Sequence, residues 1–176
     1  GLGKQPVATF ARIHKPSGSE PEDSPLVARV SERFQLGAQL EALRRLGFHW
    51  VHTGHRPNWA DVARDPNETP AWHRLDPWVE EFKGRGLWMI TNLCGSPAGS
   101  ICQERRRLGC KVHDERFDER FGAFVEGLVR RYGPPGPLRV IDFWDRPWEW
   151  EGGSGWREDA ARYRALYRLV YERAHK

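Results

Sequence analysis

The sequence predicts an α/β fold in which four parallel β-strands alternate with four helices in a single domain, residues 1–176. Short apolar segments alternate with longer segments whose apolar residues recur at helical spacing. No two predicted strands are joined by a tight turn, so each strand requires a crossover to a parallel neighbour. The apolar content of 39%, with nine Trp and eight Phe, is enough for one core.

The first unit combines a predicted strand at Val7–Ile13 with a helix that begins near Ser31. The segment Lys15–Pro25 between them is rich in Pro, Ser and Glu, which predicts a loop. The helix ends at Gly47, a favourable C-terminal stop. Its apolar residues recur at steps of three and four: Phe34, Leu36, Leu40, Leu43 and Leu46.

The other three units follow the same order. Strands are predicted at Phe48–Thr53, Leu87–Leu93 and Leu138–Trp144, and helices at Leu75–Lys83, Phe117–Tyr132 and Arg157–His175. An open doubly wound sheet and a (β/α)4 half of a (β/α)8 barrel both fit this order. The nucleotide-binding form of the open sheet needs a Gly-rich turn after its first strand, and none follows Ile13. This absence counts against the nucleotide-binding form of the open sheet, and the residues alone leave the two architectures open.

Charge and hydropathy argue against two classes of partner. The net charge is +4, but the arginines are interleaved with acidic residues, as in Asp114–Arg116 and Asp118–Arg120. This pattern is typical of solvated helix faces rather than of a nucleic-acid surface. No apolar run approaches the roughly 20 residues that a membrane span requires. We expect no nucleic-acid partner and no membrane partner.

The cysteines and histidines predict neither a metal nor a cofactor. Cys94, Cys102 and Cys110 are odd in number, and a local Cys102–Cys110 bridge remains an alternative to thiols. Their eight-residue spacing, with His113 nearby, differs from zinc sites, in which two ligands lie within two to four residues. His52 and His55 also have the spacing of a metal-binding pair. The conformation of the turn between them decides whether the two rings point the same way, and the sequence does not specify that conformation.

Candidate site residues follow the predicted strands, because both architectures bind ligands at the carboxyl ends of their strands. Indole, amide, guanidinium and carboxylate groups together suit a carbohydrate. Two simpler interpretations stay open. In the first, Asn92 and Ser96 form the turn before Pro97. In the second, Trp148 and Trp150 pack beneath the rim, by which we mean the edge formed by the carboxyl ends of the strands. The clusters are Arg12 and His14; His52, His55, Arg56 and Asn58; Asn92, Cys94 and Ser96; Asp145, Arg146, Trp148, Glu149 and Trp150.

Four segments, in their order and spacing, carry a family resemblance: Leu40–His52, Leu75–Phe82, Asn92–Pro97 and Arg130–Gly133. They resemble the N-terminal half of retaining glycoside hydrolases of the large (β/α)8, or TIM-barrel, clan, and most of all the xylosidase and iduronidase family. In that clan the fourth strand usually ends in Trp-Asn-Glu-Pro, where the glutamate is the acid/base and the asparagine holds the sugar 2-hydroxyl. Here the segment is Trp144-Asp145-Arg146-Pro147.

The resemblance implies that hydrolysis is impaired. It places Asp145 at the asparagine and Arg146 at the acid/base, and an arginine stays protonated and cannot cycle a proton. The clan carries its nucleophile on the seventh strand, and retaining hydrolysis needs two carboxyl groups about 5–5.5 Å apart. His52 falls where the family usually has an arginine.

We therefore expect a glycoside-hydrolase-like protein that binds carbohydrate. The catalytic positions are Asp145, Arg146 and Glu149, and the substrate-binding set is His14, His52, His55, Arg56, Asn92, Trp148 and Trp150. A half-barrel exposes strand edges and an apolar inner face, so a homodimer or a complementary second half-barrel is expected to cover them. Two alternatives stay open. One is an active glycosidase in which Asp145, Glu149 or Glu151 replaces the acid and a partner supplies the nucleophile; the other is an engineered or structural half-barrel without a ligand.

Overall fold

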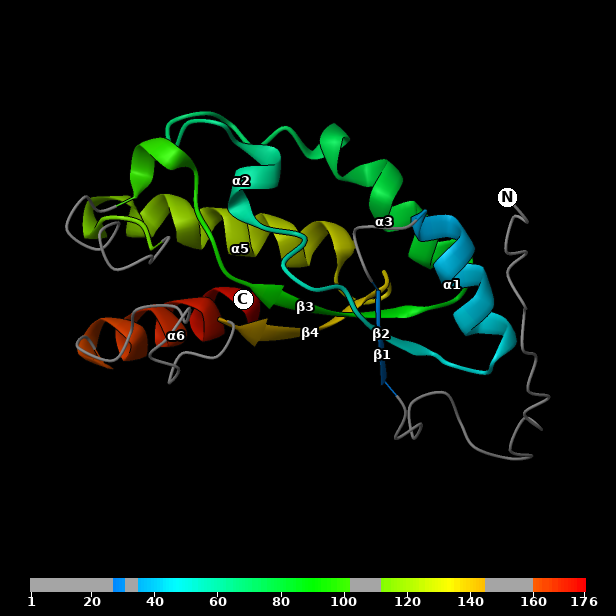
Figure 1. Cartoon of the computed structure of the whole chain (residues 1–176). Helices are drawn as coiled ribbons and strands as arrows, with labels where there is room; N and C mark the ends of the chain where they lie inside the picture. The colour runs from blue at the N-terminus through cyan, green and yellow to red at the C-terminus, as the bar shows by residue number, and fades with distance from the viewer. Residues whose placement is uncertain (1–26, 31–34, 102–111, 145–159) are drawn as a thin grey trace, which may run out of the picture.

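The computed structural model describes residues 27–30, 35–101, 112–144 and 160–176. Its centre is a four-stranded sheet in the order β1-β2-β3-β4, and all neighbouring strands are parallel (Figure 1). The strands lie side by side in the same order as in the sequence, as they do in one half of a (β/α)8 barrel. The α/β prediction is therefore confirmed. The strands are β1 Val27–Arg29, β2 Trp50–His52, β3 Trp88–Leu93 and β4 Leu138–Phe143.

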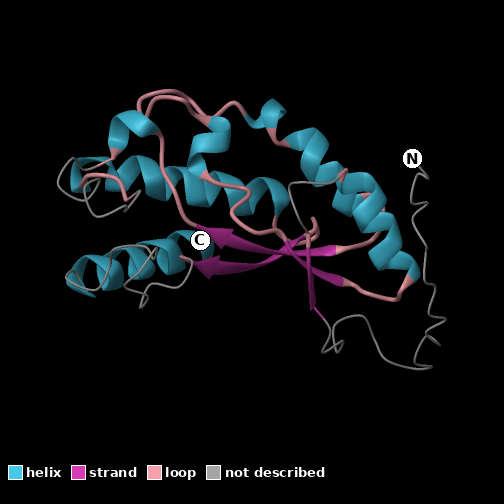
Figure 2. Ribbon diagram, in the orientation of Figure 1, coloured by secondary structure: helices cyan, strands magenta, loops and turns pink. Residues whose placement is uncertain are grey.

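Helices α1, α3 and α5 lie in the connections between successive strands, on the same side of the sheet (Figure 2). Their bounds agree with the predictions to within a few residues, whereas the short helix α2 was not predicted. None of the described helices has the length and apolar character needed to cross a membrane. The helices are α1 Leu36–Arg45, α2 Trp59–Val62, α3 Asp76–Lys83, α5 Asp118–Tyr132 and α6 Ala160–Ala174.

The first strand of the described sheet is not the predicted one. The segment predicted as the first strand, Val7–Ile13, lies outside the described residues, and the strand that pairs with β2 is Val27–Arg29. This strand has only three residues, and two of them are exposed. A segment so short carries no alternating pattern, so periodicity could not reveal it.

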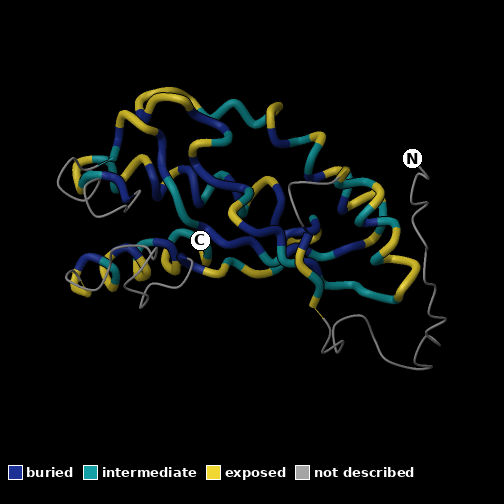
Figure 3. Tube along the Cα trace, in the orientation of Figure 1, coloured by how far each residue is buried: buried dark blue, intermediate teal, exposed yellow. Residues whose placement is uncertain are grey.

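The hydrophobic core lies between the sheet and the helices. Helix α3 buries Val79 and Phe82, and α5 buries Phe121 and Phe124 on the face that meets the sheet. Both helices are amphipathic, with charged residues on their opposite faces, so packing against the sheet removes a continuous apolar stripe from water. Figure 3 shows the buried chain concentrated in this layer. The strands contribute Val51, Met89, Leu93 and Leu138.

The other face of the sheet, here called the inner face, is less covered. Trp50 and Trp88 form an edge-to-face pair on it, with ring centroids 5.0 Å apart. Val140 on β4 is 41% exposed, although the neighbouring core positions of the sheet are almost fully buried. In a closed barrel this face would fill the interior with side-chain layers.

The pairing between β3 and β4 is shifted by one residue. Met89 pairs with Leu138, but Ile90 pairs with Val140, so Arg139 is an extra residue of β4. Its guanidinium lies over the Trp88 ring, 5.4 Å from the centroid. Such a bulge bends the strand and changes which side chains lie next to those of its neighbour.

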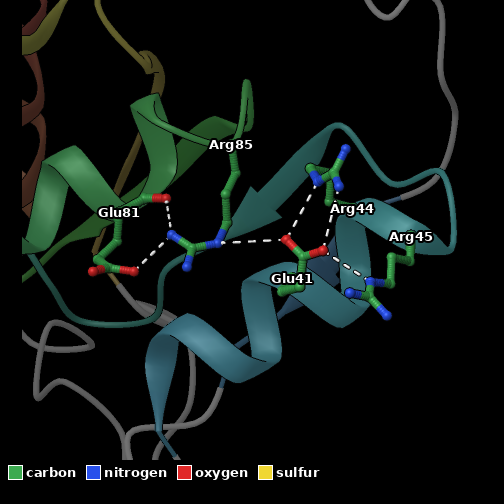
Figure 4. Close-up of polar contacts among 5 residues, drawn as sticks. All are labelled: Glu41, Arg44, Arg45, Glu81 and Arg85. Atoms are coloured by element: carbon green, nitrogen blue, oxygen red, sulfur yellow. Dashed lines mark hydrogen bonds and ion pairs between the residues drawn. The ribbon is translucent and has the colours of Figure 1, made fainter.

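A charged network joins α1 to the end of α3 (Figure 4). Glu41 accepts hydrogen bonds from Arg44 and Arg45 of its own helix, and these bonds lower its pKa to about 2. Arg85 Nε lies 3.9 Å from Glu41 Oε2, and Arg85 Nη1 donates to Glu81 at 2.6 Å. The network is at the surface, so it orients the two helices more than it stabilises them.

Candidate functional site

His52 ends β2 with its ring held in one orientation. The Gly54 N–H donates to His52 Nδ1 at 3.1 Å, which leaves the ring proton of the neutral imidazole on Nε2. Nε2 lies 3.8 Å from the carboxylate oxygen Oδ2 of Asp142 on β4. The side chains of β2 and β4 thus approach each other across β3 on the inner face.

Asn92 lies between them on β3, directly opposite Asp142 in the pairing. Its Nδ2 donates to Asp142 Oδ2 at 3.1 Å. The Asn92 side chain is buried, and its Oδ1 has no hydrogen-bond partner among the described residues. The Asp142 side chain is 53% exposed, so its carboxylate reaches solvent from the inner face.

We call His52, Asn92 and Asp142 the rim triad. It presents a carboxylate as an acceptor and one imidazole N–H as a donor, whereas the Asn92 Oδ1 is shielded from solvent. This set suits a ligand with several hydroxyl groups, which can donate to the carboxylate. Among the described residues, no group of three His, Cys, Asp or Glu side chains could hold a metal ion.

The residues predicted after β2 divide between two places. His55 is exposed, and its Nδ1 lies 2.9 Å from Cys94 Sγ in the loop after β3. Arg56 instead pairs with Asp61 of α2 at 3.8 Å and lies over the Trp78 ring of α3, 5.4 Å from the centroid. The described contacts therefore assign Arg56 to helix packing, away from the rim triad.

Asn58 fixes the loop after β3. Its Oδ1 accepts the backbone N–H of Cys94 at 2.9 Å, and its own backbone N–H donates to Asp61 at 2.7 Å. The amide therefore connects the start of α2 to the end of β3. This is a positioning role, since the side chain of Asn58 is occupied by these contacts.

Ser96 belongs to a buried chain of polar groups rather than to the open rim. Its Oγ lies 3.2 Å from His113 Nδ1, and His113 Nε2 lies 2.9 Å from Asp118 at the start of α5. Arg162 of α6 donates to both oxygens of Asp118, at 2.6 and 2.5 Å. We call these four residues the buried relay. The order Ser, His, Asp is that of a hydrolase triad, but Ser96 and His113 are only 6% and 1% exposed.

Burial and nearby charges have opposite effects on the pKa values of Asp118 and His113 in the buried relay. Burial raises the pKa of Asp118, but the hydrogen bonds from Arg162 and His113 outweigh it and lower the pKa to about 2. Burial lowers the pKa of His113, and the nearby Asp118 carboxylate opposes that change. The relay therefore consists of a carboxylate paired with an arginine and a histidine whose charged form is disfavoured, and it ties α5 to α6.

Trp144 follows β4 in a left-handed backbone conformation, with φ of +71°. The side chain is nearly buried, and this conformation is strained for a residue with a large side chain. Such residues concentrate at functional sites. Trp144 therefore makes this end of the sheet a candidate site on backbone grounds as well.

Part of the predicted site lies outside the described residues: His14, Asp145, Arg146, Trp148, Glu149 and Trp150. Within the described part, His52 and Asn92 both approach Asp142, a residue that the sequence did not point to. The available signal was a carboxylate inside the apolar segment Leu138–Phe143, where a buried strand would not tolerate it unpaired.

Solved glycoside hydrolases share this fold. A structure described as a glycoside hydrolase matches with a TM-score of 0.51 and 17% identity, over 83% of this chain and 47% of that chain. A family 39 glycoside hydrolase from the gut symbiont Bacteroides cellulosilyticus WH2 matches with a TM-score of 0.51 and 13% identity, over 84% and 28%. A GH10 endoxylanase from a sugarcane soil metagenome matches with 0.50 and 12%, over 85% and 44%.

The chain thus spans less than half the length of each matched structure. No protein-family profile matches it, and no curated protein sequence does. At these identities the likeness concerns the fold. The chain has the parallel α/β fold of glycoside hydrolases, over the part that corresponds to half of a (β/α)8 barrel.

Proposed function

We propose that the chain is a glycoside-hydrolase-like protein that binds carbohydrate at the rim triad and is impaired in hydrolysis. The supporting observation is the exposed Asp142 carboxylate, held by Asn92 at the carboxyl end of the sheet. A carboxylate with an accessible oxygen accepts hydrogen bonds from sugar hydroxyls, and the Nε2–H of His52 can donate one. Trp50 and Trp88 lie nearer the amino ends of the strands, where they fill the interior beneath this ligand site.

Impairment follows from the number of carboxyl groups. Retaining hydrolysis requires two of them about 5–5.5 Å apart, and Asp142 is the only acidic residue in the four described strands. The resemblance to retaining enzymes places Arg146 at the acid/base, and a guanidinium cannot exchange a proton at working pH. The proposed protein therefore keeps sugar recognition and lacks the proton donor.

A second half-barrel is proposed as the partner that closes the sheet. β1 and β4 are the outermost strands in the described sheet, and exposed apolar side chains lie at both edges. Val27 of β1 is 48% exposed, and Tyr167 and Tyr171 of α6 are 53% and 57% exposed. For the isolated chain the partner is a second copy, because β4 of one copy can pair in parallel with β1 of the other at both junctions.

Light scattering at micromolar concentration tests the partner. We expect a mass twice the 20.4 kDa of the chain. Substituting Tyr167→Glu places a charge at the edge and is expected to shift the mass toward one chain, whereas Glu80→Gln on α3 leaves it unchanged. A folded wild-type monomer would contradict a second copy as the partner.

Calorimetric titration with xylo-, gluco- and uronic-acid-containing oligosaccharides tests the function. Asp142→Asn removes a charged acceptor and is expected to weaken binding about tenfold or more, since such hydrogen bonds contribute about 1.5–3 kcal/mol. Glu80→Gln, on the exposed surface of α3, serves as the matched control. Absence of heat with every glycan, from folded wild-type protein, would reject carbohydrate binding and favour a purely structural half-barrel.

Residual hydrolysis is the second candidate function, favoured by the presence of one exposed carboxylate on the rim. In this case a second half supplies the nucleophile, and Asp142 or Glu149 acts as the acid. Release of phenol from aryl glycosides, lost in either Asp142→Asn or Glu149→Gln, supports this candidate. A complete lack of turnover beside normal glycan binding supports the impaired protein instead.

A further inference from the structure

The loops after β2 and β3 bring a thiol and an imidazole together beside the rim triad. His55 Nδ1 lies 2.9 Å from Cys94 Sγ, although the two residues are 39 positions apart in the sequence. Cys94 is half-buried and His55 is exposed, so the pair borders solvent. We propose that Cys94 and His55 form a reactive thiol–imidazole pair that is modified by low-molecular-weight disulfides. This inference does not rest on carbohydrate binding.

Backbone hydrogen bonds hold the two loops in register. The Thr53 N–H donates to the Ile90 carbonyl at 2.9 Å, and the Asn92 N–H donates to the Gly54 carbonyl at 3.1 Å. The Cys94 N–H is fixed by Asn58, as described above. The contact between Cys94 Sγ and His55 Nδ1 therefore joins two loops that backbone hydrogen bonds already fix. Little conformational entropy is lost when the contact forms.

Two glycines allow this approach. Gly54, just before His55, has φ of +68°, and Gly95, just after Cys94, has φ of +114°. Both values fall where residues with a Cβ are strained. The chain can thus turn on either side of the pair and direct both side chains to the same point.

The imidazole is the group that activates the thiol. It lies within hydrogen-bond distance of the sulfur, and a thiol paired with an imidazole is a stronger nucleophile at neutral pH than an isolated one. On the β1 side, Arg29 Nη2 lies 3.9 Å from the position that a Cβ on Gly54, the residue before His55, would occupy. On the α2 side, the charge of Arg56 faces Asp61 at 3.8 Å. The other titratable groups on the adjoining strands are His52 and Asp142.

The proposed reaction is thiol–disulfide exchange. His55 Nδ1 takes the thiol proton, the Cys94 thiolate attacks one sulfur of a small disulfide, and a new sulfur–sulfur bond forms as the old one breaks. The leaving thiolate carries away the electron pair and takes a proton from solvent. The product is a mixed disulfide on Cys94, two residues from Asn92, so the modification would place a bulky group at the rim.

The test uses an aromatic disulfide reagent that releases a coloured thiolate, on a chain in which Cys102→Ser and Cys110→Ser leave Cys94 as the only thiol. We expect the reaction at pH 6.5 to be at least about tenfold slower in His55→Ala, with the midpoint of its pH–rate profile moved to higher pH. His55→Gln, which keeps a polar side chain but does not titrate, is expected to be equally slow. His73→Ala, on the separate turn Trp72–Arg74, is the matched control and should react like the parent.

Circular dichroism verifies that each variant is folded. Equal rates and equal pH midpoints in the parent, His55→Ala and His55→Gln would overturn the proposal, because the imidazole would then have no influence on the thiol. A parent chain whose Cys94 does not react at all while folded would overturn it equally.

Discussion

The helix-covered face and the inner face of the sheet differ in how completely their side chains are removed from water. Met89 and Leu93 of β3 are fully buried beneath α3 and α5, whereas Val140 of β4, on the inner face, is 41% exposed. Each buried Å² of apolar surface contributes about 25 cal/mol. The covered face therefore supplies most of the folding energy, and the inner face keeps side chains in contact with solvent.

Truncation of a buried side chain on the covered face should have the largest effect on stability. Phe124 of α5 is fully buried and stacks with Trp72 at a centroid distance of 5.9 Å. Phe124→Ala is expected to lower the free energy of unfolding by about 4 kcal/mol, because it removes a ring and leaves a cavity. Urea unfolding followed by circular dichroism measures the change.

A substitution on the inner face is the control for that experiment. Val140→Ala also removes apolar atoms, but the Val140 side chain is already partly exposed to water. Its expected cost is less than about 1 kcal/mol. Equal losses in the two variants would contradict the assignment of the core to the helix-covered face.

A smaller loss of stability is expected when the buried relay, which joins α5 to α6, is disrupted. Asp118→Asn removes the carboxylate to which Arg162 donates, and the Arg162 side chain is only 5% exposed. Removing one member of such a pair is expected to cost about 3 kcal/mol. Glu119→Gln, which affects an 83% exposed carboxylate paired with Arg173, is the matched control with an expected cost of at most about 1 kcal/mol.

The effect of Asp118→Asn should depend on pH. The pKa of Asp118 is about 2 in the folded chain, below the value of about 3.9 in an unfolded one. Its contribution to stability is therefore complete above about pH 4 and is lost as the pH falls toward 2. Urea unfolding at pH 5, 4 and 3 should show the wild type and the variant converging, and a constant difference would contradict the ionised pair.

Periodicity was sufficient to predict the helices that carry apolar stripes and the strands β3 and β4, because these elements are long enough to show a pattern. It could not find β1, whose three residues show no repeat, or α2, which is a single turn around the buried Trp59. Of the predicted site residues, His52 and Asn92 both approach Asp142 at the carboxyl end of the sheet. Asp142 was missed because candidates were sought after the strand ends, and Asp142 lies within a strand. The contact between His113 and Ser96 joins residues that are distant in the sequence, and local periodicity carries no information about such contacts.

The extra residue in β4 has one further consequence. Had the ladder continued without interruption from the pair of Leu138 with Met89, even-numbered residues of β4 would lie on the helix side, and Ile141 would be the neighbour of Asn92. Arg139 inverts this parity from Val140 onward. Asp142 therefore points away from the apolar core, where an unpaired charge would be strongly destabilising. One additional residue thus decides whether a carboxylate or an alkyl group lies beside Asn92 on the inner face.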